Sequence, residues 1–144
     1  MKVQLKRLNP EAKGLCYAHP GDSGVDLYAV EDHLIKPGER KLIGTGISIS
    51  VPKGYEAQVR PKSGLAANHG VTVLNTPGTV DSGYRGEVKV IAINLGEQTY
   101  TVEKGKKIAQ MVFCKVEEAE IEDVEELDDT TRGEGGFGST GLGE

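Results

Sequence analysis

The chain has 144 residues, no tryptophan, two phenylalanines and five tyrosines, and its formal net charge is −5 at pH 7. This length is that of one domain, but the few large side chains predict a sparse core of Val, Ile and Leu that oligomerisation would supplement. No apolar run reaches membrane-spanning length, the N-terminus lacks a signal-peptide core, and no basic stripe with interleaved aromatics indicates nucleic-acid binding. We therefore expect a soluble, cytoplasmic protein with neither membrane nor nucleic acid as a partner.

Short segments that alternate apolar and polar residues, or are rich in β-branched residues, recur along the first 116 residues between Gly, Pro, Asn and Asp. This pattern is typical of an all-β protein and favours a small barrel-like or jelly-roll fold. A helical turn or two is expected at 63–68, with Ser63 as its N-cap. The predicted strands are residues 2–8, 24–30, 40–51, 54–60, 87–95, 98–102 and 107–116.

The first segment suited to chemistry runs from His19 to Ala29 and places Asp22 and Asp26 around two glycines. A carboxylate there would hold the water shell of a Mg²⁺ ion, but the spacing is not that of a dedicated metal cage. We expect any cation to arrive with the phosphates of a ligand. Cys16 and Cys114 form no metal-type cluster, so we expect reduced thiols and no zinc site.

The second segment, residues 60–66, places Arg60 and Lys62 just before Ser63 at the expected helix start. Two cations and the free amides of Gly64 and its neighbours would form a phosphate site. The alternative is a purely structural Ser-Gly cap that follows a basic strand end.

The third segment, residues 75–88, is predicted to be a β-hairpin with an acid and a phenol near its turn. Asp81 is the best general-base candidate, because three glycines bracket it and a carboxylate held close to a ligand would take a proton from water. Tyr84 offers a flat face for a sugar. The alternative is an ordinary turn aspartate beside a packed tyrosine.

The fourth segment, residues 104–113, places Gln110 inside an otherwise apolar strand. A polar side chain in such a strand needs a hydrogen-bond partner, and a ligand oxygen is one candidate. The three histidines show no partner pattern, and we expect each of them to be structural.

The last 28 residues differ in charge from the rest. Residues 117–144 hold eleven acids and one base, whereas the first 116 hold sixteen bases and eleven acids, so a body of +5 precedes a tail of −10. A positive body suits an anionic substrate, and the acidic run either guides the tail across it or forms a solvated linker. RGEGGFGSTG, residues 132–141, combines one cation and one aromatic with glycines and hydroxyls, which predicts an arm that closes over a nucleotide. A flexible polar tail is the alternative.

Taken in order, SGVDL, PKSGLA, GTVDSGYRGE, GKKIAQ and RGEGGFGSTG resemble the five motifs of the trimeric dUTP nucleotidohydrolases, the dUTP diphosphatases, over residues 19–141. No single motif is decisive, but five in this order and spacing are highly specific. The resemblance implies a jelly-roll-like (β-clip) subunit in residues 1–116. It implies an acidic linker and a flexible C-terminal arm in 117–144 that caps a neighbour's site, and a homotrimer with three sites at subunit interfaces.

The activity that the resemblance implies is Mg²⁺-assisted hydrolysis of dUTP to dUMP and pyrophosphate, which limits uracil incorporation into DNA and supplies dUMP for dTMP synthesis. Asp81 would deprotonate the water that attacks the α-phosphorus, Tyr84 would lie under the deoxyribose, and Asp26 would sit in the outer shell of the Mg²⁺ ion. The implied substrate-binding residues are Lys62, Ser63, Gly64, Asn75, Gly78, Val80, Tyr84, Gln110, Arg132, Phe137, Gly138, Ser139 and Thr140.

The chain departs from the family at one position, because Lys62 stands where the second motif usually has arginine. A lysine keeps the charge but loses the planar fork that binds a phosphate with two hydrogen bonds. Arg60, two residues earlier, is a candidate to compensate.

Two other functions stay open. A dCTP deaminase, alone or bifunctional, shares this fold, but it needs a glutamate acting at the pyrimidine ring, and no matching segment is visible. A nucleotide-binding trimer without turnover is the second alternative, against which Asp81, Tyr84 and the complete arm argue.

Overall fold

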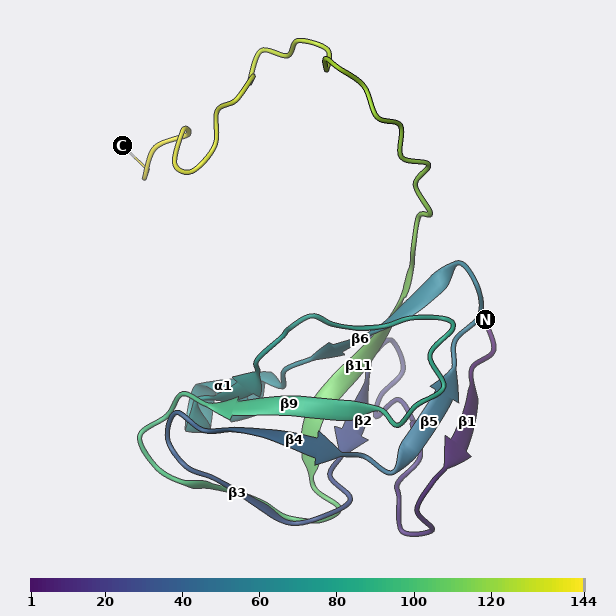
Figure 1. Cartoon of the computed structure of the whole chain (residues 1–144). Coiled ribbons are helices and arrows are strands. Elements are labelled where there is room, and N and C mark those ends of the chain that lie inside the picture. The colour runs from purple at the N-terminus through teal and green to yellow at the C-terminus, as the bar shows by residue number, and fades with distance from the viewer. Residues whose placement is uncertain (144) are drawn as a thin grey trace.

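The structure is a computed structural model that describes residues 1–143, and it is built almost entirely of strands (Figure 1). One short helix, α1 (Ser63–His69), interrupts them. The strands are β1 (Gln4–Arg7), β2 (Gly24–Tyr28), β3 (His33–Ile35), β4 (Arg40–Gly44), β5 (Ile47–Ser50), β6 (Tyr55–Arg60), β7 (Val71–Val73), β8 (Gly78–Val80), β9 (Lys89–Asn94), β10 (Tyr100–Val102) and β11 (Lys107–Lys115).

The strands form antiparallel sheets that enclose one core. The largest sheet has the order β2-β11-β6-β8, the next has the order β4-β9-β7, and β1 pairs with β5 and β3 with β10. Alternate residues of these strands, such as Leu27, Val59 and Met111 of the largest sheet and Ile43 and Val90 of the next, are buried in a common cluster. The expected all-β, jelly-roll-like fold is therefore confirmed, with the core filled by Val, Ile, Leu and Ala.

Most predicted strands occur within a few residues of their expected bounds, and the exceptions have local causes. The strand expected at 40–51 is divided into β4 and β5 because Gly46 adopts a φ of 72°, which extended backbone does not allow. A Cβ at Gly46 would lie 2.9 Å from the Cβ of Ala12, so the chain also packs closely there. β3 and β7, three residues each, were not predicted.

The helix α1 ends at a tight contact. Gly70, with a φ of 66°, donates its N–H to the carbonyl of Ala66 as a left-handed C-cap. A Cβ on Gly70 would lie 2.6 Å from the backbone nitrogen of Gly96, in the turn that follows β9. This contact fixes the helix against the three-stranded sheet.

The segment 75–88 is not a β-hairpin, which corrects the sequence prediction. β8 pairs with β6, whereas β9, which follows it, pairs with β4 and β7 in another sheet. The chain from Asp81 to Val88 is therefore a crossing between two sheets. The glycines of this segment indicated a local turn between two paired strands, but β8 pairs instead with β6, an earlier strand of the large sheet.

The C-terminal tail leaves the body at the end of β11 and extends away from it (Figure 1). Residues 116–143 contain no regular element and are exposed apart from the half-buried Gly136. Within residues 1–143, no helix is long and apolar enough to cross a membrane.

Candidate active site

Asp26 on β2 joins the first, second and fourth motifs through two ion pairs. Its Oδ1 lies 2.5 Å from Nζ of Lys62, and its Oδ2 lies 2.8 Å from Nζ of Lys107. Burial alone would raise the pKa of Asp26, but hydrogen bonds from Lys107 and Lys62 and their positive charges outweigh it and hold the pKa below its ordinary value. The hydrogen bond to Asp26, with its charge, in turn raises the pKa of Lys107. The carboxylate therefore stays ionised and orients two ammonium groups.

Gln110 on β11 belongs to the same cluster. It lies opposite Asp26 on one side and Arg60 on the other, so the three residues form a row across three strands. Its Nε2 donates to the carbonyl of Pro61 at 2.9 Å. A Cβ at Gly24 would lie 2.5 Å from its Oε1, so a larger residue there would displace this amide from its present position. The carbonyl of Pro61 thus supplies one of the hydrogen-bond partners that were expected for the Gln110 amide.

Ser63 is the first residue of α1 and not its N-cap, which corrects the predicted position by one residue. Lys62 occupies the cap in extended conformation, and no side chain caps the helix. The first N–H that bonds within the helix is that of Ala66, to the carbonyl of Lys62. The amides and hydroxyl at Ser63 and Gly64 therefore face solvent beside the lysine pair, as a phosphate cradle requires.

Lys62 points at Asp26, and Arg60 does not supply the missing fork. The Nε and Nη2 atoms of Arg60 donate to Oε1 of Gln58 at 2.9 and 2.5 Å. The Nε–Nη2 edge of its guanidinium group is therefore engaged on its own strand. The positive charge at this end of the sheet comes from Lys62, Lys107 and Arg60.

The candidate base Asp81 lies in an exposed turn after β8. Its carbonyl accepts a hydrogen bond from the N–H of Tyr84 at 3.1 Å, which closes the turn. No hydrogen bond or ion pair of its carboxylate occurs among the described residues. The carboxylate is therefore free to bind water.

Tyr84 is held by its own turn. Its hydroxyl donates to the carbonyl of Glu87 at 2.9 Å, and the side chain is 46% exposed. A Cβ on Gly86 would lie 2.5 Å from Cζ of this ring, and closer still to its hydroxyl oxygen. The ring therefore lies directly over Gly86, which explains a glycine at that position.

The uracil-side residues lie along β8 and the turn before it. Gly78 and Val80 are buried within the sheet, whereas Asn75 is exposed. A Cβ on Gly78 would lie 3.3 Å from Nδ2 of Asn75, so this amide rests against the backbone at the start of β8.

Within one chain, Asp81 and the Asp26 cluster do not meet. Val80 pairs with Ala57, whereas the row of Asp26 and Gln110 pairs with Arg60, three residues farther along β6. At about 3.3 Å per residue, this separation is roughly 10 Å along the strand. The structure therefore places the predicted site residues in two separate groups, the Asp81 turn and the Asp26 cluster.

The arm residues lie apart from both groups, in the extended tail (Figure 1). Arg132 bonds only locally, from Nε to the carbonyl of Gly135 at 2.9 Å, and Gly138, Ser139 and Thr140 are exposed. Phe137 is fully exposed and has a φ of 49°, the one positive value among the described non-glycine residues. An aromatic ring in this state lacks the partner that would bury it.

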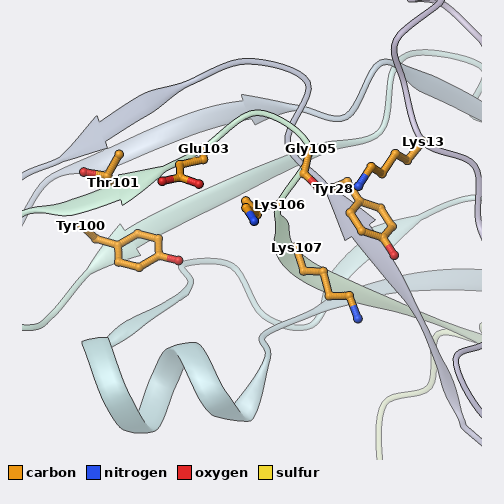
Figure 2. Close-up of a pocket in the computed structure, with 8 residues that line it drawn as sticks. All are labelled: Lys13, Tyr28, Tyr100, Thr101, Glu103, Gly105, Lys106 and Lys107. Atoms are coloured by element: carbon orange, nitrogen blue, oxygen red, sulfur yellow. Dashed lines mark hydrogen bonds between the residues drawn. The ribbon is translucent and has the colours of Figure 1, made fainter.

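A hollow beside this cluster was not predicted from the sequence. A cavity of about 650 Å³ is lined by Lys13, Lys106 and Lys107 together with Tyr28, Tyr100 and Glu103 (Figure 2). The adjacent lysines of the fourth motif were its only signal in the sequence, because Lys13 and the tyrosines come from distant segments.

No group of three or more potential metal ligands occurs within residues 1–143. Asp26 is the one carboxylate of the lysine cluster, and each of its oxygens already accepts a hydrogen bond from a lysine. Such a donor set fits a cation that is carried by phosphates and touches the protein through water. Cys16 and Cys114 are free thiols.

Comparisons with known proteins agree with these motifs. The family model described as dUTPase matches residues 11–141. The chain belongs to the dUTPase family. It is 60% identical to the deoxyuridine 5'-triphosphate nucleotidohydrolase of Clostridium kluyveri, over 98% of this chain and 99% of the relative. It is 56% identical to that of Nautilia profundicola, over 98% and 99%.

Among solved structures, a dUTPase of Staphylococcus bacteriophage 80alpha, a mutant crystallised with dUpNHpp, superimposes with a TM-score of 0.91. Its sequence is 27% identical, and the match covers 98% of this chain and 99% of the phage chain. The fold is therefore that of the dUTPases over nearly the whole chain.

Proposed function

We propose that this dUTP diphosphatase converts dUTP to dUMP and pyrophosphate by attack of water on the α-phosphorus. The observation that carries the proposal is the family match across all five motifs, joined to an exposed Asp81 carboxylate without a partner among the described residues and a solvent-facing amide cradle at α1. The reaction limits uracil incorporation into DNA and supplies dUMP for dTMP synthesis.

The triphosphate binds at the Asp26 end of the large sheet. The amides and hydroxyl of Ser63 and Gly64 hold the α- and β-phosphates, because these donors have no partner within the helix. Gln110 contributes the hydrogen-bonding groups of its amide that Pro61 does not engage. Lys62, paired with Asp26, supplies positive charge. Together they steady the pyrophosphate as it leaves.

The nucleoside binds along β8 and the turn that follows it. Asn75, Gly78 and Val80 bind the uracil edge through side-chain and backbone groups, and cytosine is rejected because its donors and acceptors are exchanged. Tyr84 lies under the deoxyribose and leaves no space for a 2′-hydroxyl. Asp81 orients the attacking water and takes its proton.

The complete site requires several subunits. The Asp81 turn and the lysine cluster lie apart within one chain, and the tail reaches away from both. We therefore propose a homotrimer in which residues 1–116 form the β subunit, residues 117–131 link it to the arm, and the arm closes a site shared by its neighbours. Arg132 binds the γ-phosphate, Phe137 stacks on uracil, and Gly138, Ser139 and Thr140 complete the cradle.

dUTP would bind as its Mg²⁺ complex, and the ion would offset negative charge on the triphosphate and so favour attack at phosphorus. Asp26 would hold the ion through water, and Lys62 and Lys107, which lie on either side of that carboxylate, keep Asp26 ionised.

The test is pyrophosphate release from dUTP, dCTP, dTTP and UTP, each with Mg²⁺ and with a chelator, with ammonia followed in the dCTP sample. Metal-dependent release from dUTP alone is expected. Ammonia from dCTP would favour a deaminase of the same fold, and binding of dUTP without release would favour a trimer that has lost turnover.

A further inference from the structure

A positively charged cavity, here called the lysine hollow, is lined by Lys13, Lys106, Lys107, Tyr28 and Tyr100. Of its three lysines, only Lys107 forms an ion pair among the described residues. Lys13 donates to the carbonyl of Gly105 at 2.8 Å and lies 4.8 Å from the centre of the Tyr28 ring. Lys106 forms no ion pair within residues 1–143. Figure 2 shows Lys106 and Lys107 between the two tyrosines, so cations and aromatic faces are presented together.

The tail contains a segment of opposite character. Residues 117–129, here called the acidic segment, hold nine acids and no base. Its three larger apolar side chains, Ile121, Val124 and Leu127, recur at every third position and are 84%, 53% and 85% exposed. No hydrogen bond joins this segment to the rest of the described chain, and Figure 1 shows it running away from the body. Both its charge and its apolar groups lack partners within the subunit.

We propose that the acidic segment of a second copy crosses the lysine hollow, with its acids at the lysines and Val124 and Leu127 on the tyrosine rings. The inference rests on the proposed trimer and specifies how the tail reaches its neighbour. Glu103 is the one acid that lines the hollow, beside Tyr100, so an apolar residue of the segment belongs at that end and its acids lie toward Lys106.

The path agrees with the position of the arm. Lys107 lines the lysine hollow and also pairs with Asp26, so the hollow adjoins the Asp26 cluster, where the triphosphate is proposed to bind. Arg132 is the third residue after Asp129, a span of roughly 10 Å in extended chain. When Arg132 reaches the γ-phosphate, the last acids of the segment therefore lie beside the hollow. Docking there shortens the search of the arm for the site and raises its effective concentration.

A charge-exchange experiment tests the contact in the full-length protein. Lys106→Glu is expected to raise KM for dUTP about three- to tenfold at low salt, because arm closure loses its electrostatic guide. Adding Glu125→Lys and Glu126→Lys to the same chain is expected to restore KM. Lys53→Glu, an equal charge change in an exposed turn, is the control. An effect of Lys53→Glu equal to that of Lys106→Glu, or failure of the exchange to restore KM, overturns the proposal.

Cross-linking tests the contact without activity. In a background with Cys16 and Cys114 replaced by serine, chains carrying Lys106→Cys are refolded with size-tagged chains carrying Glu125→Cys and oxidised. A disulfide between the two chain types is expected, and Lys53→Cys should give none. The absence of a cross-link between the two chain types refutes the inference. So does a disulfide within one chain when Lys106→Cys and Glu125→Cys are combined in the same chain. Because turnover plays no part, a protein that cross-links but does not hydrolyse dUTP refutes the proposed function alone.

Discussion

Replacement of Gly86 by alanine tests whether the position of the Tyr84 ring sets activity. The new Cβ would lie 2.5 Å from Cζ of Tyr84, whereas ordinary contact begins at 3.4 Å, so the ring has to retreat by about 1 Å. Gly86 has no positive φ, so the backbone accepts alanine. Tyr84 is 46% exposed and is able to swing outward, at the loss of its hydrogen bond to Glu87.

The expected cost to the fold is therefore small and the cost to activity large. One such hydrogen bond contributes about 1 kcal/mol to stability. A displacement of about 1 Å at a reacting centre lowers kcat/KM on the order of 10²-fold. We also expect discrimination of dUTP against UTP to weaken, because the ring no longer closes the space beside the sugar.

The assay measures kcat/KM for dUTP and UTP by pyrophosphate release, with the unfolding free energy from urea titration. Gly83→Ala is the matched control, because a Cβ at Gly83 meets no atom within 4 Å. Full activity in Gly86→Ala, or an equal loss in Gly83→Ala, would refute the assignment of Tyr84 to the sugar.

Three further changes test other parts of the site. Asp81→Asn is expected to lower kcat by about 10²- to 10⁴-fold while dUTP affinity by calorimetry is kept; lost affinity with normal turnover contradicts the base assignment. Gly64→Ala is expected to stabilise α1 by up to about 1 kcal/mol in urea titration and yet raise KM, because its methyl group enters open space beside the phosphates; unchanged KM contradicts the cradle. The Asp26 pairs lower its pKa below 3.8, so their stabilisation is complete above that pH and disappears as the pH falls through the lower folded value. The stability difference between the wild type and Asp26→Asn should therefore shrink below pH 4, and a constant difference would exclude the linkage.

The sequence predicted the strands well because their signal is local. Alternation in Ile47 to Val51 and in residues 87–95 marks a buried face whatever the partner strand is. β3 and β7, three residues each, are too short to show a period, whereas the equally short β10 lies within the β-branched stretch predicted at 98–102. The helix start was misplaced by one residue, since Lys62 and Ser63 both precede a helical run and only the backbone dihedrals distinguish them.

Pairing between distant segments could not be predicted from the residues alone. The resemblance brought the motifs together in function, but the contact of Asp26 with Lys107 depends on β2 lying beside β11. The pairing of β8 with β6, which excludes a hairpin at 75–88, is of the same kind. The lysine hollow likewise gathers residues from three separate stretches of chain, and only the adjacent lysines of the fourth motif signal it in the sequence.

The lysine at position 62 is consistent with the arrangement around it. An arginine fork would engage both oxygens of the Asp26 carboxylate at once, whereas the point charge of Lys62 occupies only Oδ1 and leaves Oδ2 to Lys107. Lys107 also lines the lysine hollow, so Asp26 and the hollow share this cation. Two ammonium groups around one carboxylate leave a net positive charge at Asp26. Such a charge suits an anionic substrate, and a lysine at position 62 maintains it as an arginine would, without the planar fork.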